Sequence, residues 1–454
     1  MSEKARKVVD MTDGSIWRHI VRFALPVLLG NLFQQLYNTF DSIVVGRFAG
    51  KESLAAVSGS GNLIFMMTSF FIGLSIGAGV VISHWFGGHD EKRLEAAIHT
   101  DVAFGAVCGL VLTAAGICFT PQILTWMRTP ADVLPLSTVY FRIYFAGSLA
   151  AVLYNTFTGI LQAMGDSRSP LRFLVIASLT NVALDLLFVG VFSMGVAGAA
   201  TATVISQVMS AALCLRRLLR MEGSFRLDLK RVRFDREELR RIVRQGVPTG
   251  LQNSIIAIAN VTVQSHINTF GSDTMAGYGA NAKVEGFVFL PITAFSMAMT
   301  TFIGQNLGAG KDQRAKAGAR FGILSAMVMA ESIGVLVYVL APYAIRLFND
   351  DPQVVAVGVR GARIESLFYF ALAMAHAISA VMRGVGKAGI PMYTMLGCWC
   401  VLRVTYITVT LRFVRDVAVI FWAYPLTWTV SCAVFAVCYF RINWQQAARS
   451  VSPY

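Results

Sequence analysis

Residues 26–46 read PVLLGNLFQQLYNTFDSIVVG, an apolar stretch broken by a few polar side chains. A helix that crosses the hydrocarbon of a bilayer needs roughly 20 mainly apolar residues, and this stretch has that length. Its pattern returns in the second half of the chain, where Pro248 and Asn253 follow Pro26 and Asn31 at a spacing of 222 residues. The stretch therefore predicts a membrane helix that the chain carries in two copies.

Stretches of the same kind recur along the whole sequence. The 454 residues are 56% hydrophobic and 14% charged, whereas about a quarter of the residues of an average soluble domain are charged. We predict an all-α polytopic membrane protein with about twelve transmembrane helices. The predicted spans are residues 20–45, 54–86, 96–119, 136–164, 170–192, 197–219, 242–269, 275–307, 319–347, 359–382, 391–413 and 417–440.

The repeat extends well beyond one helix. The same spacing places Asp90 on Asp312, and a spacing of 221 residues places Arg142 on Arg363. Because each copy has an even number of spans, the copies share one orientation about an axis along the membrane normal, as in many transporters. We predict two pseudo-symmetric six-helix lobes, residues 1–219 and residues 242–454. A basic linker, residues 220–241, joins them.

The positive charge is banded rather than spread. A net charge of +14 could suggest a nucleic-acid partner, but the Lys and Arg residues fall in alternate loops, as the positive-inside rule requires. The pattern predicts a multi-pass protein of the cytoplasmic membrane with both termini in the cytoplasm and no nucleic-acid partner. The longest basic band, residues 216–244, should be attracted to anionic lipid head groups.

Polar side chains within the spans are candidates for function, because ionisable groups are costly in the bilayer. Gln34, Tyr37, Asn38 and Asp41 share one face of the first span, since they follow steps of three and four residues. In the fifth span, Asn181 and Asp185 stand one helical turn apart within one apolar run. If the two acids meet away from water, repulsion lets one of them bind and release a proton. Alternatively, Asp41 is a hydrated residue near the outer end of its helix.

The second lobe does not repeat this pair, because Asp41 maps to Val263 and Asp185 to Tyr406. We therefore expect any proton site only in the first lobe. Lys283 and Glu285 either neutralise each other or a neighbouring charge, or they contact a substrate. Pro26 removes a backbone hydrogen bond inside the first span and can act as a hinge or a fixed kink.

Other classes of protein find little support. The seven cysteines lie in or beside the spans without CxxC spacing, and we find no HExxH or GxSxG motif, so neither a cofactor nor an enzyme activity is expected. A channel would need a filter loop or a ring of acids, which the sequence also lacks.

The sequence resembles the multidrug and toxic compound extrusion (MATE) family over nearly its whole length. The resemblance lies in the 6 + 6 repeat, in NVALD at residues 181–185, and in two longer stretches. These are TDGSIWRHIVRFALPVLLGNLFQQLYNTFDSIVVGRFAG from Thr12 and GANAKVEGFVFLPITAFSMAMTTFIGQNLGAG from Gly279. The resemblance implies two lobes forming a V around a central cavity. It also implies export of cationic amphiphilic compounds, driven by an inward proton or sodium gradient.

The resemblance also assigns roles to single residues. It implies coupling at Asp41, Asn181 and Asp185 with Tyr37 as an aromatic neighbour, and a helix hinge at Pro26. Polar positions lining the first-lobe pocket match less securely. With the polar residues of the spans, they give the candidate substrate cavity: Gln34, Asn38, Tyr140, Asn155, Thr201, Thr203, Gln252, Gln264, Lys283 and Glu285.

The coupling ion and the substrate stay open between alternatives. The seventh span contains no acid, unlike the norfloxacin-type branch of the family, so the chain resembles the DNA-damage-inducible branch. We expect coupling to protons, although Asp41, Asn181 and Asp185 could also form a sodium site. The rival within transport is a flippase for lipid-linked oligosaccharides, and we expect the protein to function as a monomer.

Overall fold

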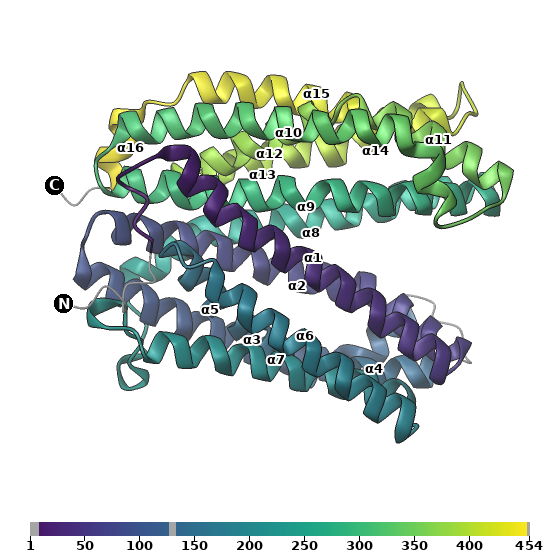
Figure 1. Ribbon diagram of the computed structural model, residues 1–454, viewed down its shortest axis with the longest axis horizontal. Helices are drawn as coiled ribbons and strands as arrows, with labels where there is room; N and C mark the ends of the chain where they lie inside the picture. The colour runs from purple at the N-terminus through teal and green to yellow at the C-terminus, as the bar shows by residue number, and fades with distance from the viewer. Residues whose placement is uncertain (1–8, 127–132, 452–454) are drawn as a thin grey trace. The chain divides into compact units, whose positions relative to one another are not determined.

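The structure is a computed structural model that describes residues 9–126 and 133–451. All the secondary structure in this part of the chain is helical, which confirms the predicted fold class (Figure 1). The first half contains α1 Ile16–Phe48, α2 Lys51–Gly87, α3 Glu91–Trp126, α4 Leu134–Ala146, α5 Ser148–Ala163, α6 Arg168–Asp185, η1 Leu186–Val191, α7 Gly195–Leu219, η2 Gly223–Phe225 and η3 Leu229–Arg231. The second half contains α8 Arg236–Asn268, α9 Ser272–Gly308, α10 Asp312–Arg346, α11 Pro352–Ser366, α12 Tyr369–Gly384, α13 Gly389–Met395, η4 Leu396–Leu402, α14 Arg403–Thr410, α15 Ala418–Phe440 and α16 Trp444–Val451.

Two of the predicted spans are bent rather than straight. Among the described residues, eight helices are long and apolar enough to cross a membrane, and ten if each of two bent pairs is one span. One pair is α4 and α5, which meet at 46°, and the other is α11 and α12, which meet at 54°. The predicted spans 136–164 and 359–382 each cross one of these bends. The helices α1 and α8 have 33 residues each and would reach about 50 Å, but their polar side chains keep them out of this set.

Two π-helical segments interrupt the predicted fifth and eleventh spans, one in each half of the chain. The first, η1, begins directly after Asp185, and the second, η4, ends directly before Arg403. π-helical turns are rare and frequently occur at functional sites. The polar residues beside these segments, Asp185 and Arg403, are therefore candidates for a functional role.

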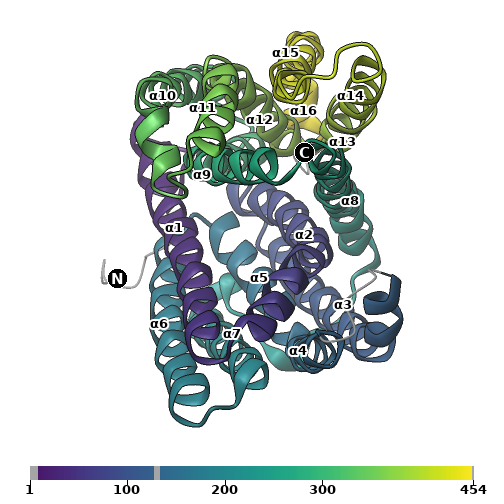
Figure 2. The same ribbon diagram turned by 90° about the vertical axis from the view of Figure 1, so that its right-hand side faces the viewer.

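The described chain forms two compact units. Unit 1 contains the described residues up to Asp10 and Leu29–Gly246, and unit 2 contains Met11–Leu28 and Val247–Tyr454. In unit 1, α5 packs on α2, α3 and α7, while α4 packs on α3 and α7. In unit 2, α12 packs on α9, α10 and α15, while α11 packs on α10 and α15 (Figure 2). The neighbours correspond helix by helix, which confirms the repeat predicted from the sequence.

The boundaries of the two units do not coincide with the two halves of the sequence, because α1 and α8 are each divided between the units. The first part of α1 packs in unit 2, and the chain enters unit 1 at Leu29. The first part of α8 packs in unit 1, and the chain enters unit 2 at Val247. Each crossing lies within three residues of a proline, Pro26 or Pro248, and both prolines lie inside a continuous helix.

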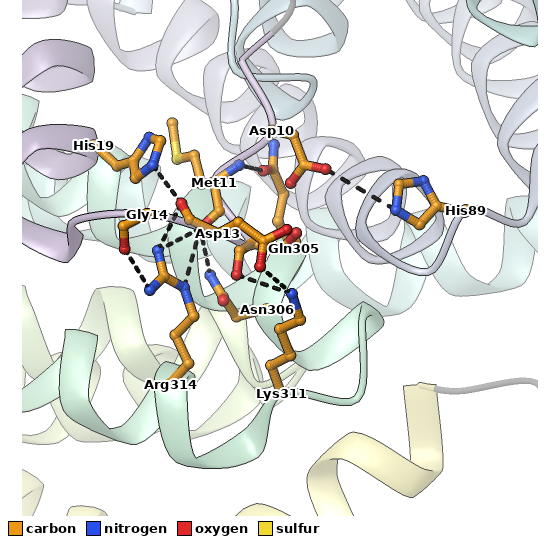
Figure 3. Close-up of polar contacts among 11 residues, drawn as sticks. Asp10, Met11, Asp13, Gly14, His19, His89, Gln305, Asn306, Lys311 and Arg314 are labelled. Atoms are coloured by element: carbon orange, nitrogen blue, oxygen red, sulfur yellow. Dashed lines mark hydrogen bonds and ion pairs between the residues drawn. The ribbon is translucent and has the colours of Figure 1, made fainter.

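The segment Met11–Gly14 is fixed to unit 2 by a dense set of hydrogen bonds (Figure 3). The guanidinium of Arg314 donates to the carbonyl oxygens of residues 11, 13 and 14, over 2.7–3.4 Å. Lys311 Nζ donates to the carbonyl oxygen of residue 12 and to Asp13 Oδ1. Gln305 Oε1 accepts from the amide of Met11, and Asn306 Nδ2 donates to the Met11 carbonyl oxygen. The start of α1 therefore has a fixed position on α9 and α10.

The start of α8 is fixed to unit 1 in a comparable way. Trp85 on α2 donates from Nε1 to Glu238 Oε2 over 2.8 Å, and the guanidinium groups of Arg93 and Arg241 lie 4.9 and 5.0 Å from the centre of its indole ring. Glu238 is buried, and burial raises the pKa of its carboxyl group above the usual value. These contacts fix the first turns of α8 on α2 and α3.

Candidate functional site

Two buried acids meet in unit 1. Asp41 on α1 and Asp185 at the end of α6 are both buried, and their carboxyl groups lie close enough to interact. The structure therefore brings together the two acids singled out in the sequence, and Asp41 is buried rather than exposed at the end of its helix.

Asn181 and Thr203 extend the cluster around Asp185. In the amide orientation that satisfies both neighbours, Asn181 Nδ2 donates to Asp185 Oδ2 over 3.0 Å and Oδ1 accepts from the Thr203 amide over 3.3 Å. Asn181 stands one helical turn before Asp185 on α6, and Thr203 lies on the adjacent α7. The spacing along α6 thus sets the contact, and the packing of α6 on α7 completes it.

Three tyrosines line the same region. The Tyr37 hydroxyl lies beside Thr203, and Tyr140 lies near both acids. Tyr144, which the sequence analysis did not select, stacks on Tyr140 with ring centres 6.4 Å apart. Its hydroxyl lies beside Gln207 on α7. Aromatic faces next to acids attract organic cations.

Several buried oxygens of the cluster lack a hydrogen-bond partner within the described chain. They are Asp41 Oδ1, Asp185 Oδ1, Thr203 Oγ1 and Gln207 Oε1. Buried polar atoms are nearly always paired, so such a group of atoms needs an explanation. Carboxylate, hydroxyl and amide oxygens suit a proton or a hard cation such as sodium.

Four other predicted cavity residues in unit 1 do not join this cluster. Gln34 and Asn38 are exposed on α1. Asn155 donates to the Ala151 carbonyl oxygen and Thr201 donates to the Ala197 carbonyl oxygen, so both bond to the preceding turn of their own helix.

Unit 2 contains a second buried polar cluster. Asn281 Nδ2 donates to Glu365 Oε2 over 2.8 Å. Arg403 is buried and donates from Nη2 to Thr427 Oγ1 over 3.1 Å. Glu285 lies close enough to Glu365 and Arg403 to interact with both charges. Glu365 was not among the residues predicted from the sequence.

Aromatic groups surround Arg403 as well. Its guanidinium lies 4.3 Å from the ring centre of Tyr424 and 5.4 Å from that of Trp399. The hydroxyl of Tyr424 lies 2.7 Å from that of Tyr278, within hydrogen-bonding distance. The second cluster therefore has a fixed positive charge, whereas the first cluster consists of acids, amides and hydroxyls.

The remaining predicted residues of unit 2 lie apart from Arg403. Lys283 and Glu285 do not neutralise each other, because Lys283 is exposed, with its Nζ 5.3 Å from the ring centre of Phe348. Residues two apart on a helix point in different directions, which explains the difference. Gln252 Nε2 lies 2.8 Å from Met395 Sδ, and Gln264 donates to Asn268 Oδ1.

The two clusters occupy corresponding places in the repeat. The 221-residue spacing places Tyr144 on Glu365 and Thr203 on Tyr424. Both pairs belong to the clusters just described. Glu365 could have been predicted from the sequence, because it is an ionisable residue inside an apolar span. It also stands at the repeat position of a first-lobe tyrosine.

The matches to known proteins agree with this architecture. The MatE family model matches the chain twice, over residues 26–187 and 248–409. The probable multidrug resistance protein YoeA of Bacillus subtilis is 31% identical over 379 residues, 82% of this chain and 82% of that protein. YpnP of the same organism, also a probable multidrug resistance protein, is 30% identical over 381 residues, 84% of this chain and 85% of that protein.

Solved structures show the same fold. The crystal structure of MATE in the bent conformation has a TM-score of 0.91 at 22% identity and covers 98% of this chain and 99% of that chain. Two copies of a membrane-helix unit, each with polar residues buried inside it, define a multi-pass membrane transporter. The chain belongs to the MATE family.

Proposed function

We propose that the protein exports cationic amphiphilic compounds across the cytoplasmic membrane in exchange for protons. The observation that carries the proposal is the buried pair of Asp41 and Asp185, whose carboxyl groups lie close enough to interact in unit 1. Two carboxylates in contact cannot both be ionised at low cost, and the pair can take up and release one proton. The names of the relatives support multidrug export.

A proton and an organic cation would compete for the same negative charge. A cation near Tyr37, Tyr140 and Tyr144 would be stabilised by the acids and by the aromatic faces. Protonation would remove that charge and weaken binding. In this mechanism, protonation also repacks α1 around Pro26 and releases the compound outwards.

Sodium is the alternative coupling ion. The unpartnered oxygens of Asp41 and Asp185, with those of Thr203 and Gln207, are ligand types that hard cations prefer. The same residues would bind a proton or a sodium ion, so a transport measurement has to distinguish the two coupling ions.

The rival function is a flippase for lipid-linked oligosaccharides. Such a transporter would be expected to have a strongly basic cavity. Among the buried residues in the described part of the chain, the only Lys or Arg side chains are Arg383 and Arg403. Arg383 donates to Ser379 in its own helix, so the composition favours organic cations.

The test is ethidium efflux from vesicles that contain the purified protein, with proton and sodium gradients imposed separately. We expect a proton gradient alone to drive efflux, and Asp41→Asn and Asp185→Asn each to abolish it. Efflux driven only by sodium would assign the same acids to a cation site. Wild-type efflux by either variant at normal protein levels would refute coupling at this pair.

The matched control is Asp350→Asn, the same change at an exposed acid in the loop after α10. It should leave efflux unchanged. If neither gradient moves the dye in the wild-type protein, the exporter proposal fails, and lipid-linked substrates become the next candidates to assay.

A further inference from the structure

The linker between α7 and α8 carries more positive charge than its surroundings neutralise. Residues 216–244 contain eleven Lys and Arg residues and five Asp and Glu residues. Arg217, Arg231 and Arg241 form ion pairs within unit 1. Within the described chain we find no ion pair for the others: Arg216, Arg220, Arg226, Lys230, Arg233, Arg236, Arg240 and Arg244.

The linker nevertheless has a defined conformation. Leu227 is fully buried in the core of unit 1. The Asp228 amide donates to His99 Nε2 over 3.0 Å, and the Asp235 amide donates to Thr100 Oγ1 over 3.0 Å. Arg231 Nη1 donates to Glu95 Oε1 over 2.7 Å. These contacts with α3 determine which linker side chains point inward and which point outward.

Two large apolar side chains point outward between these anchors. Leu229 is 55% exposed and Phe234 is 50% exposed, and the unpaired Lys230 and Arg233 lie between them in the sequence. Most exposed apolar residues of the described chain lie on the predicted spans, where lipid tails can cover them. Leu229 and Phe234 lie outside the predicted spans, where only the interfacial region of the bilayer could cover them.

We propose that this linker surface, defined as Leu229, Lys230, Arg233 and Phe234, docks on anionic phospholipid head groups of the adjacent leaflet. The linker joins two membrane helices over a short distance along the chain, so it must stay near the membrane surface. Each Lys or Arg near an anionic surface contributes about 1 kcal/mol of attraction. Leu229 and Phe234 would enter the boundary between head groups and acyl chains, as apolar residues of interfacial segments do.

The inference does not depend on the transported compound or the coupling ion. It can be tested by hydrogen–deuterium exchange of the full-length protein in nanodiscs. One set of discs contains phosphatidylcholine only, and the other contains a minority of phosphatidylglycerol. We expect amides of residues 226–236 to exchange at least about fivefold more slowly in the anionic discs, the factor that about 1 kcal/mol gives.

Two double variants test the chemistry of the surface. Leu229→Ser with Phe234→Ser, and Lys230→Gln with Arg233→Gln, should each remove the difference between the two kinds of disc. Unchanged exchange in α3 and α7 will show that the variants are folded. The matched control is Arg412→Gln with Phe413→Ser, which alters an exposed Arg and Phe before α15 and should keep the wild-type difference.

Two results would overturn the proposal. Equal exchange of the wild-type linker in both kinds of disc would show that anionic lipid does not bind there. Full protection in phosphatidylcholine discs on addition of inorganic phosphate would identify a site for a free anion instead of a lipid.

Discussion

Arg403 is the one buried positive charge in the polar cluster of unit 2, as far as the described residues show, and two acids lie near it. Replacing it by methionine would leave Glu285 and Glu365 without a compensating charge. Removing one partner of a buried charge cluster typically costs about 3–5 kcal/mol. We therefore expect Arg403→Met to lower the thermal unfolding midpoint of the detergent-purified protein markedly.

The double variant Arg403→Met with Glu365→Gln separates charge from packing. It should be more stable than Arg403→Met alone, because it removes one of the two uncompensated acids. An additive loss in the double variant would mean that Arg403 acts through its hydrogen bonds to Thr427 and its contact with Tyr424, without a charge interaction with Glu365.

Glu238 gives a pH dependence of known sign. Its pKa is raised by burial, so the stability that its protonated form contributes is complete below the ordinary glutamate value of about 4.3 and is lost as the pH rises through the raised pKa. Glu238→Gln, which stays neutral and can still accept from Trp85, should equal the wild type in acid and exceed it in stability at neutral pH.

The neighbouring Glu237 is the matched control for this measurement. It is exposed, and its hydrogen bond with Arg241 lowers its pKa. Glu237→Gln should therefore lose stability at neutral pH and recover towards the wild type as the pH falls through that lowered value. Unfolding midpoints recorded from about pH 3 to about pH 8 will separate the two variants, and parallel curves would contradict both assignments.

Single residues show how far the sequence could lead. Asn181 and Asp185 could be paired because one helical turn separates them, and their meeting with Asp41 followed from the same reasoning about buried acids. Tyr144 and Gln207 could not be found, because each looks like ordinary polar packing until α4 and α7 are placed side by side. Asn155 and Thr201 show the opposite error, since a polar side chain in a span can bond to its own helix.

At the scale of elements, close helix contacts depend on particular glycines. A Cβ atom on Gly77 of α2 would lie 2.2 Å from the Gly246 amide nitrogen of α8, both in unit 1. Backbone atoms in two packed helices cannot move aside cheaply, and overpacking commonly costs about 1–3 kcal/mol or more. We expect Gly77→Ala to lower the yield of monodisperse protein and its unfolding midpoint.

Gly286 in α9 provides the control for this prediction. No atom lies within 4 Å of a Cβ built there, and alanine is favoured over glycine inside a helix by about 1 kcal/mol. Gly286→Ala should therefore be neutral or slightly stabilising. Equal behaviour of the two variants would show that α2 and α8 do not need the close approach at Gly77.

The bends and π-helical segments mark the limit of prediction for elements. Apolar runs at residues 136–164 and 359–382 indicated spans but could not reveal a bend, because the bends at Gly147 and at residues 367–368 depend on local packing. A Cβ on Gly147 would meet the Val204 side chain on α7 at 2.5 Å, a contact that is defined only in the folded unit.

At the scale of the whole molecule, the duplication was predictable because it is recorded residue by residue in the sequence. Identical spacing of prolines, asparagines and acids required only a comparison of the chain with itself. The division of α1 and of α8 between the two units was not predictable in this way. It depends on long-range contacts, such as those of Arg314, for which the sequence contains no periodic signal.

The fixation of Met11–Gly14 on α9 and α10 has a consequence for the order in which the protein is made. The hydrogen bonds of Met11 join residues 294 to 303 positions apart. At the usual rate of translation, these partners leave the ribosome on the order of tens of seconds after Met11 itself. The start of α1 must therefore wait in the membrane without its final neighbours, and unit 2 cannot finish assembling without residues that were synthesised first. A truncation or fusion that disturbs the first residues of the chain will impair the maturation of its last-made half.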